Sequence, residues 1–197
     1  ESVGKKLKKL EKSFDNGKII KDGIKTAIIG KPNAGKSSLL NAILKEDRAI
    51  VTDIAGTTRD TIEEFVTING IPLNLVDTAG IREASDEVEK IGVEKSIKQA
   101  NDADLIIAIF DSSKDLEEED IEILNLIKGK KSIILLNKSD LNSKIDENDE
   151  RFTSITENIL KISALNKSGI DELYEKIAEL FNLNEINLDN EILITNI

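Results

Sequence analysis

The stretch Gly30-Lys31-Pro32-Asn33-Ala34-Gly35-Lys36-Ser37 decides the fold. An apolar, β-branched run at residues 24–29 predicts a strand before it, and the apolar spacing over residues 38–44 predicts a helix after it. A glycine loop between a strand and a helix is typical of a phosphate-binding loop, in which backbone N–H groups and the helix N-terminus surround a phosphate. We therefore expect Lys36 to reach the phosphates and Ser37 to offer a hydroxyl to Mg²⁺. The flanking strand and helix disfavour the alternative, a chance match in a turn.

The composition of the 197-residue chain excludes several kinds of site. The chain has neither cysteine nor histidine, which excludes disulfides, thiolate metal sites, cysteine nucleophiles and imidazole catalysis. Any metal must therefore be a hard ion bound by oxygen atoms. The net charge of −11 argues against broad nucleic-acid binding. Because no signal peptide or long apolar run is present, we expect a cytoplasmic protein without membrane contact.

Three segments are expected along the chain. Residues 21–182 alternate predicted strands and helices, which predicts a doubly wound α/β sheet, six-stranded and mostly parallel. Two β-type runs around Asn69-Gly70 predict one antiparallel hairpin at the edge of that sheet. The helical spacing of residues 1–20 and the remaining segment 183–197 are expected to belong to a neighbouring helical domain of a longer protein.

The later elements are predicted from apolar spacing in the same way. Continuous apolar runs indicate buried strands, and apolar residues spaced three or four apart indicate helices. The predicted elements are a helix at 85–100, strands at 104–110, 132–136 and 159–162, helices at 117–127 and 169–181, and a loop at 142–157.

Polar motifs follow three further predicted strands, and the carboxyl ends of parallel strands bind ligands in such sheets. Asp77-Thr78-Ala79-Gly80 suits a water-mediated Mg²⁺ contact and detection of a γ-phosphate. Asn137-Lys138-Ser139-Asp140 predicts guanine selectivity. A carboxylate can accept hydrogen bonds from the N1–H and the amino group of guanine, whereas adenine has an acceptor at N1 that would leave the carboxylate unpaired. Ser163-Ala164 would offer a backbone N–H to guanine O6, although this pair is also common at ordinary strand ends. Together the motifs resemble the translation-factor-like branch of the Ras-like P-loop GTPases.

The motifs leave the catalytic parts open. Ras-like GTPases have a water-orienting glutamine directly after Asp-x-x-Gly, and here that position is Ile81. Arg59 and Arg82 are candidates for an arginine finger or for surface ion pairs. Asn33 and backbone carbonyls of residues 52–56 could instead hold a monovalent cation that neutralises developing charge. The carboxylates near Ile81 are those of Glu83, Asp86, Glu87 and Glu89.

Longer stretches resemble one family. Residues 30–41, 49–60 and 77–92 resemble the G domain of the MnmE family of bacterial tRNA-modification GTPases, most strongly over residues 24–110. The resemblance implies hydrolysis of GTP to GDP and phosphate, with Mg²⁺ and K⁺ as cofactors and with dimerisation of the G domains. In the longer protein it implies an FAD-dependent partner enzyme and carboxymethylaminomethyl modification of the tRNA wobble uridine. No direct nucleic-acid binding is expected from this part.

The resemblance also implies roles for individual residues. Catalysis is expected from Glu89, which would position the attacking water through a bridging water, together with Thr58 and Gly80. The implied Mg²⁺ ligands are Ser37, Thr58 and Asp77. The implied K⁺ site consists of Asn33, Thr52, Ile54 and Thr57. The expected nucleotide contacts come from Asn33, Ala34, Gly35, Lys36, Ser37, Ser38, Thr57, Asp77, Gly80, Asn137, Lys138, Asp140, Ser163, Ala164 and Leu165.

Two other functions stay open. A ribosome-assembly GTPase of the Era or double-G-domain type shares the phosphate loop and the hydrophobic residue after Asp-x-x-Gly, although residues 83–89 argue against it. A nucleotide-binding interaction module without meaningful hydrolysis would turn over slowly, and a Glu89→Ala substitution would not slow it further. Turnover measurements separate these alternatives from the GTPase hypothesis.

Overall fold

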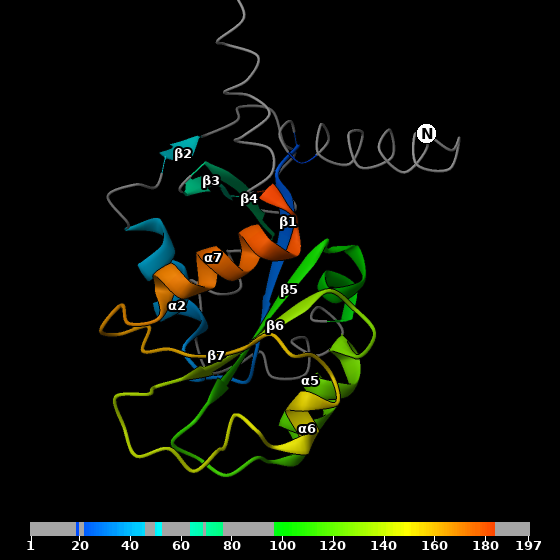
Figure 1. Cartoon of the computed structure of the whole chain (residues 1–197), viewed down its shortest axis with the longest axis vertical. Helices are drawn as coiled ribbons and strands as arrows, with labels where there is room; N and C mark the ends of the chain where they lie inside the picture. The colour runs from blue at the N-terminus through cyan, green and yellow to red at the C-terminus, as the bar shows by residue number, and fades with distance from the viewer. Residues whose placement is uncertain are drawn as a thin grey trace, which may run out of the picture.

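A computed structural model of the chain describes residue 19 and residues 22–45, 50–52, 64–68, 70–76 and 97–183. Figure 1 shows these elements along the chain. The strands are β1 (Ile24–Ile29), β2 (Ile50–Thr52), β3 (Glu64–Ile68), β4 (Ile71–Leu75), β5 (Leu105–Asp111), β6 (Ser132–Asn137) and β7 (Ile159–Lys161). The helices are α2 (Lys36–Leu44), α5 (Glu118–Ile127), α6 (Glu150–Thr153) and α7 (Ile170–Leu180), and residues 97–102 are also helical.

The strands form one sheet in the order β2-β3-β4-β1-β5-β6-β7. The strands from β4 to β7 pair in parallel, and β3 is antiparallel to both β2 and β4. The predicted mostly parallel, doubly wound α/β class is confirmed. The predicted hairpin is also present, with Ile68 opposite Ile71 and Gly70 at φ 80° in the turn.

In the described part of the chain the sheet nevertheless has seven strands rather than the predicted six. The additional strand is β2, which pairs with β3 through the register Val51↔Val66 and occupies the edge. The hairpin therefore lies one strand inside the edge. A run of three residues is too short to show a strand period, so only pairing with β3 defines it.

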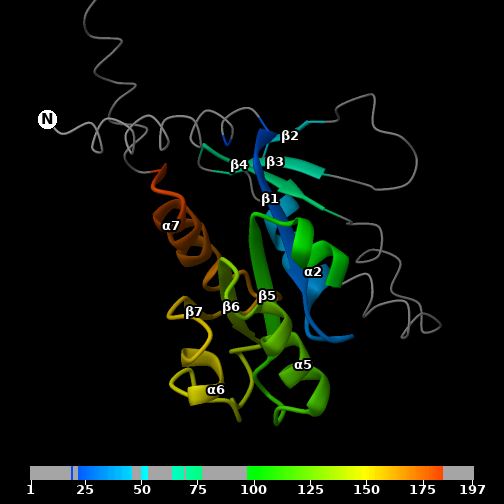
Figure 2. The ribbon, with the colours of Figure 1, turned by 90° about the vertical axis from the view of Figure 1, so that its right-hand side faces the viewer.

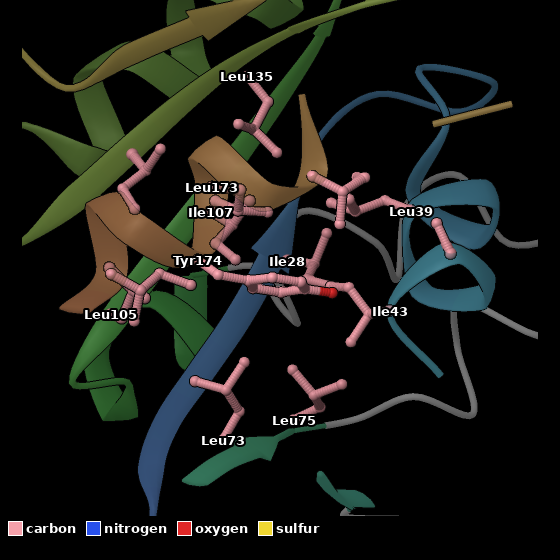
Figure 3. Close-up of a cluster of buried hydrophobic side chains, with 14 of the residues drawn as sticks. Ile28, Leu39, Ile43, Leu73, Leu75, Leu105, Ile107, Leu135, Leu173 and Tyr174 are labelled. Atoms are coloured by element: carbon pink, nitrogen blue, oxygen red, sulfur yellow. The ribbon is translucent and has the colours of Figure 1, made fainter. Parts of the chain in front are cut away.

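Helices cover both faces of the sheet (Figures 1 and 2), and each face has its own apolar core. Side chains alternate across β5, so Leu105, Ile107 and Ile109 enter the core under α2 and α7, while Ile106, Ala108 and Phe110 enter the core under α5 and α6. In the first core the Tyr174 ring extends from α7 toward Ile43 of α2, past Ile28 of β1 (Figure 3). Full burial of an isoleucine or leucine side chain contributes roughly 2 kcal/mol.

Most predicted element bounds agree with the structure to within about two residues, which is the usual uncertainty at element ends. The predicted loop at residues 142–157 is wrong in part, because it contains the one-turn helix α6. The Asp149 side chain accepts a hydrogen bond from the Arg151 amide at 2.9 Å and thereby starts that helix. Of the predicted helix at 85–100, residues 85–96 lie outside the described part, and residues 97–100 are helical.

The expected segment bounds at 1–20, 21–182 and 183–197 stay predictions, because most residues beyond both bounds lie outside the described part. Ile19 packs partly against the core under α2 and α7, and Leu183 is buried in it. No helix among the described residues has the length and apolar character that crossing a membrane requires.

Candidate functional site

The phosphate-binding loop joins β1 to α2 and lies against β5 and β6. Gly35 precedes α2 with φ 112°, a backbone conformation that residues with a Cβ rarely adopt. A Cβ on Gly35 would also collide with the side-chain nitrogen of Asn137, and a Cβ on Gly30 would lie 2.5 Å from the Ile109 carbonyl oxygen. Both positions therefore require glycine, and the absence of side chains also lets the loop approach a phosphate closely.

Lys36 is folded back onto its own loop. Its Nζ donates hydrogen bonds to the carbonyl oxygens of Gly30 and Lys31, each at 2.6 Å. Burial lowers the pKa of Lys36 to about 8, because the charged form loses hydration. A phosphate oxygen is a stronger acceptor for an ammonium group than a neutral carbonyl, so a bound phosphate would compete for this lysine.

Other predicted phosphate and metal residues lie on the same loop and helix. Asn33 has φ 61° and is exposed, as is Ser38, while Ser37 lies half-buried in the first turn of α2. A serine hydroxyl is a hard oxygen donor of the kind that Mg²⁺ accepts. The described residues contain no cluster of three or more acidic side chains that could hold a metal. The remaining proposed partners, Thr58 and Asp77, lie outside the described residues.

Of the predicted K⁺ ligands, Asn33 is described with its side chain, and Thr52 only by its backbone at the end of β2. The other predicted residues of this half of the site lie outside the described part, so their roles stay predictions. They are Ile54, Thr57, Gly80 and Glu89.

The guanine-recognition end is joined to the phosphate loop by Asn137, the last residue of β6. Its Nδ2 donates to the Ala34 carbonyl at 2.8 Å, and its Oδ1 accepts from the Ala164 amide at 3.0 Å. Asn137 is 3% exposed, so both bonds are shielded from water. One buried amide thus connects three predicted motifs that lie far apart in the sequence.

The amides predicted to face guanine O6 are engaged within the protein in this structure. The Ala164 amide donates to Asn137, and the Ser163 amide donates to the Ser168 carbonyl at 3.0 Å. The predicted contact therefore stays a prediction, and it would need the Ala164 amide to be shared or released. Leu165, the next predicted nucleotide residue, is 79% exposed.

Asp140, the predicted guanine acceptor, is oriented by the neighbouring loop. Its Oδ1 accepts a hydrogen bond from the Ser163 hydroxyl at 2.6 Å, which ties the loop after β6 to the loop after β7. The other carboxylate oxygen and the remaining lone pairs can accept from a ligand. The structure therefore brings Asn137, Asp140 and the Ser163-Ala164 pair together, and their contacts with guanine stay predictions.

Two acidic residues that were not expected at the site lie at the end of β5 and in the first turn of α5. Asp111 Oδ2 lies 2.6 Å from Lys138 Nζ, and Asp120 Oδ2 lies 2.8 Å from Lys31 Nζ. Burial alone would raise the pKa of Asp111, but hydrogen bonds from Lys138 and Ser113 outweigh it and hold that pKa below its usual value. Asp111 ends a buried strand, as the other motifs do, and this position is the signal that could have identified it.

The pKa of Lys31 is also set by its ion-pair partners. Burial alone would lower its pKa, but hydrogen bonds to Asp120 and Glu117 outweigh burial and raise the pKa above its ordinary value. Asp120 also accepts the Glu117 amide at 2.9 Å in the capping box of α5. The start of α5 is therefore bonded to the phosphate loop.

The sequence matches known GTPases over most of its length. Residues 25–138 match a family model described as 50S ribosome-binding GTPase. The chain is 58% identical over 192 residues to a protein of Finegoldia magna named tRNA modification GTPase MnmE, covering 98% of this chain and 42% of that protein. A protein of the same name from Lachnoclostridium phytofermentans is 57% identical over 193 residues, again with 98% and 42% coverage. The chain thus spans less than half the length of these relatives, and the predicted resemblance is confirmed.

A solved structure shares the fold. The crystal structure of an Aquifex aeolicus Era variant bound to GDP.AlF4- matches with a TM-score of 0.54 and 31% sequence identity. The match covers 79% of this chain and 56% of that chain. The predicted Ras-like P-loop GTPase fold is confirmed by this similarity together with the sheet order.

Proposed function

The chain belongs to the family of 50S ribosome-binding GTPases and is a GTPase, and from this premise we propose that it hydrolyses Mg²⁺-bound GTP in a potassium-dependent manner. The observation that carries the proposal is the double hydrogen bond of Asn137, which brings the phosphate loop, the Asn-Lys-x-Asp motif and Ser163-Ala164 to one place. Phosphate loops alone occur in many NTPases, but a carboxylate at Asp140 beside them favours guanine. GTP would lie across the carboxyl ends of β1, β6 and β7.

Mg²⁺ would be held by Ser37, Thr58 and Asp77. When bound, it neutralises charge on the β- and γ-phosphates. Lys36 would leave the Gly30 and Lys31 carbonyls and pair with the phosphates, since its charged form is poorly hydrated where it now lies. The N-terminus of α2 would add backbone N–H donors from the same direction.

Potassium dependence is proposed because two observations fit it. Ile81 occupies the position of the water-orienting glutamine of Ras-like GTPases. Because its side chain cannot orient water, another group must assist hydrolysis. Asn33 is exposed on the phosphate loop and offers a side-chain oxygen. Together with Thr52, Ile54 and Thr57 it would hold K⁺, which supplies positive charge to the transferring phosphate. Glu89, with Thr58 and Gly80, would position the attacking water.

The further role rests on the relatives. We propose that nucleotide-dependent dimerisation of this domain drives tRNA wobble-uridine modification by a longer protein working with an FAD-dependent enzyme. The support is the name of relatives 57–58% identical over 98% of this chain, which are tRNA modification GTPases. The chain covers 42% of those proteins, so their remaining parts would supply tRNA binding and the modification chemistry.

A second candidate is a ribosome-assembly role of the Era type. The description of the matching family and the 31% identity to Era favour it. The longer protein would then bind ribosomal particles in a GTP-dependent manner. Co-sedimentation of the longer protein with ribosomal subunits would support this candidate, whereas loss of the wobble-uridine modification in a deletion strain would support the first.

The test is GTP turnover with Mg²⁺ in matched KCl and NaCl over a range of protein concentrations. We expect faster turnover in KCl, rising more than linearly with protein concentration because dimers form the active site. Glu89→Ala should remove most of this activity while GDP still binds. Equal turnover in both salts, linear in protein concentration, would contradict potassium-dependent, dimer-assembled catalysis.

A further inference from the structure

We infer that Asp111 is a positioning residue for Lys138 and that it raises guanine-nucleotide affinity by fixing this lysine before the nucleotide arrives. The inference rests on the proposed function, because it takes Lys138 to be a nucleotide-binding residue. Asp111 itself need not touch the nucleotide. Its effect would pass through Lys138.

The sheet register places the two residues side by side. Asp111 is the last residue of β5 and lies opposite Asn137, the last residue of β6, so Lys138 directly follows the neighbouring strand. Asp111 Oδ2 and Lys138 Nζ are 2.6 Å apart. The Asp111 side chain is 8% exposed and that of Lys138 is 31% exposed. The carboxylate side of this pair is therefore buried, unlike in the surface ion pairs that contribute little.

Asp111 is itself held firmly. Its Oδ1 accepts hydrogen bonds from the Ser113 amide at 3.1 Å and from the Ser113 hydroxyl at 2.6 Å. The Ser112 amide donates to the Asn137 carbonyl at 2.9 Å and continues the β5–β6 pairing past the strand end. The carboxylate is thus a rigid acceptor, with Oδ2 left for the lysine.

Lys138 needs such an anchor. Its backbone has φ 65°, a left-handed conformation that turns the chain from β6 into Asp140. A lysine side chain has many rotamers, and ordering it on binding weakens affinity. With Nζ held over the end of β5, the aliphatic stem must span the edge between β5 and β6. The stem is then ordered in the nucleotide-free protein.

The contrast with Asp115 separates this role from general surface electrostatics. Asp115 lies in the same β5–α5 segment and pairs with Lys144 at 2.9 Å, but its side chain is 81% exposed. Lys144 belongs to no nucleotide motif. Asp115→Asn is therefore a matched control, since it removes the same charge from the same segment.

The experiment is a double-mutant cycle on GDP affinity, with the whole 197-residue chain and a fluorescent GDP analogue. We expect Asp111→Asn to weaken binding about 10-fold, equivalent to about 1.4 kcal/mol. Lys138→Ala should weaken it at least as much, and Asp111→Asn should add little in the Lys138→Ala background. Asp115→Asn should leave affinity unchanged. In turnover, Asp111→Asn should raise KM and leave kcat almost unchanged.

Two results would overturn the inference. One is unchanged affinity in Asp111→Asn, and the other is an equal loss in the presence and absence of Lys138, which would indicate a structural role. If Asp111→Asn does not fold, Asp111→Glu takes its place in the cycle, because it keeps the charge and displaces it by one methylene. A wild-type chain that binds neither GDP nor GTP would overturn the proposed function instead.

Discussion

The phosphate end and the guanine end of the site are built in different ways. At the phosphate end, Lys36 bonds to carbonyl oxygens only five and six positions away in its own loop. At the guanine end, Asn137 bonds to Ala34 across 103 positions, and Asp140 bonds to Ser163 across 23. The Lys36 side chain is thus held within its own loop, whereas the contacts of Asn137 and Asp140 require the sheet to be assembled. The two ends meet where Asn137 contacts the phosphate loop.

The largest expected effect comes from Gly35→Ala, which affects both ends together. The left-handed backbone costs about 1–2 kcal/mol for a residue with a Cβ. The collision with Asn137 would also remove a buried hydrogen bond worth roughly 1 kcal/mol. We expect the free energy of unfolding to fall by about 3 kcal/mol, with GDP binding lost, as urea unfolding and titration can measure.

Gly129→Ala is the control for Gly35→Ala. Gly129 also has a positive φ, 75°, but a Cβ there would meet no atom within 4 Å. Gly129→Ala should therefore cost only about 1 kcal/mol and leave GDP affinity intact. Equal losses in the two variants would show that strain alone matters and that the contact with Asn137 does not.

Asn137→Ala tests the connection between the two ends directly. It leaves the Ala34 carbonyl and the Ala164 amide without their partner, and both residues are buried. We expect the nucleotide-free protein to lose about 2 kcal/mol of stability. Asn148→Ala should change stability little, because the Asn148 side chain donates to Asp146 within one exposed turn. An unaltered unfolding midpoint in Asn137→Ala would mean that the ends fold independently.

Lys36→Ala should have the opposite profile. Its hydrogen bonds are local and burial penalises its charged form, so Lys36→Ala should not lower the stability of the nucleotide-free protein at pH 7. GDP affinity should fall on the order of 100-fold, since two or more charge-assisted contacts to phosphate are lost. Isothermal titration and thermal unfolding measure the two quantities. A fall in stability as large as in Asn137→Ala would contradict the local anchoring of Lys36.

The pH dependence of binding sharpens the same contrast. The pKa of Lys36 is about 8 in the free protein, and phosphates would raise it, so binding above pH 8 takes up a proton. GDP affinity should be level below pH 8 and fall above it, by up to about tenfold per pH unit. The same fall with pyrophosphate, which carries no base, would assign the titration to the phosphate end. A level profile up to pH 9.5 would contradict the assignment.

The folded-state pKa of Lys36 also has a consequence for stability. Because this pKa lies below the ordinary lysine value of 10.5, the unfolded chain binds more protons than the folded protein between pH 8 and 10.5. The lysine's contribution to stability therefore rises with pH across this window. Lys36→Ala should remove that part of the pH dependence.

The smallest effect is expected from Ser163→Ala at the guanine end. It removes the hydroxyl that orients Asp140 at 2.6 Å and leaves the Ala164 amide bond in place. We expect the preference for GDP over IDP to fall roughly fivefold, since one hydrogen bond is worth about 1 kcal/mol. IDP lacks the amino group from which Asp140 would accept a hydrogen bond. The measurement is therefore the ratio of the GDP affinity to the IDP affinity. An unchanged ratio would show that Asp140 needs no orientation by Ser163.

Much of the fold could be predicted because its signals are local. The strand at residues 24–29, the Asn69-Gly70 hairpin and the helix that became α7 all follow from apolar spacing and turn residues. The short strand β2 and the one-turn helix α6 could not, because each is too short to show a period. Their pairing and capping partners decide them.

The site divides in the same way. The motif residues Lys36, Asn137 and Asp140 could be predicted because each motif has a chemical meaning of its own. The pairing of Asp111 with Lys138 and of Asp120 with Lys31 could not, since an aspartate after a strand or in a helix start is usually a solvated turn or cap residue. The sheet order is what brings these charges together.

By itself, the sequence determined which residue types stand at the strand ends: a glycine loop for phosphate and a carboxylate for guanine. It also excluded imidazole and thiol groups from catalysis. Only the tertiary structure decided which of them touch. It placed β1 beside β5 and β5 beside β6, so that Asn137 reaches Ala34 and Asp111 reaches Lys138. The physical reason is that the sequence specifies donors and acceptors, while strand order sets the few-ångström distances that hydrogen bonds require.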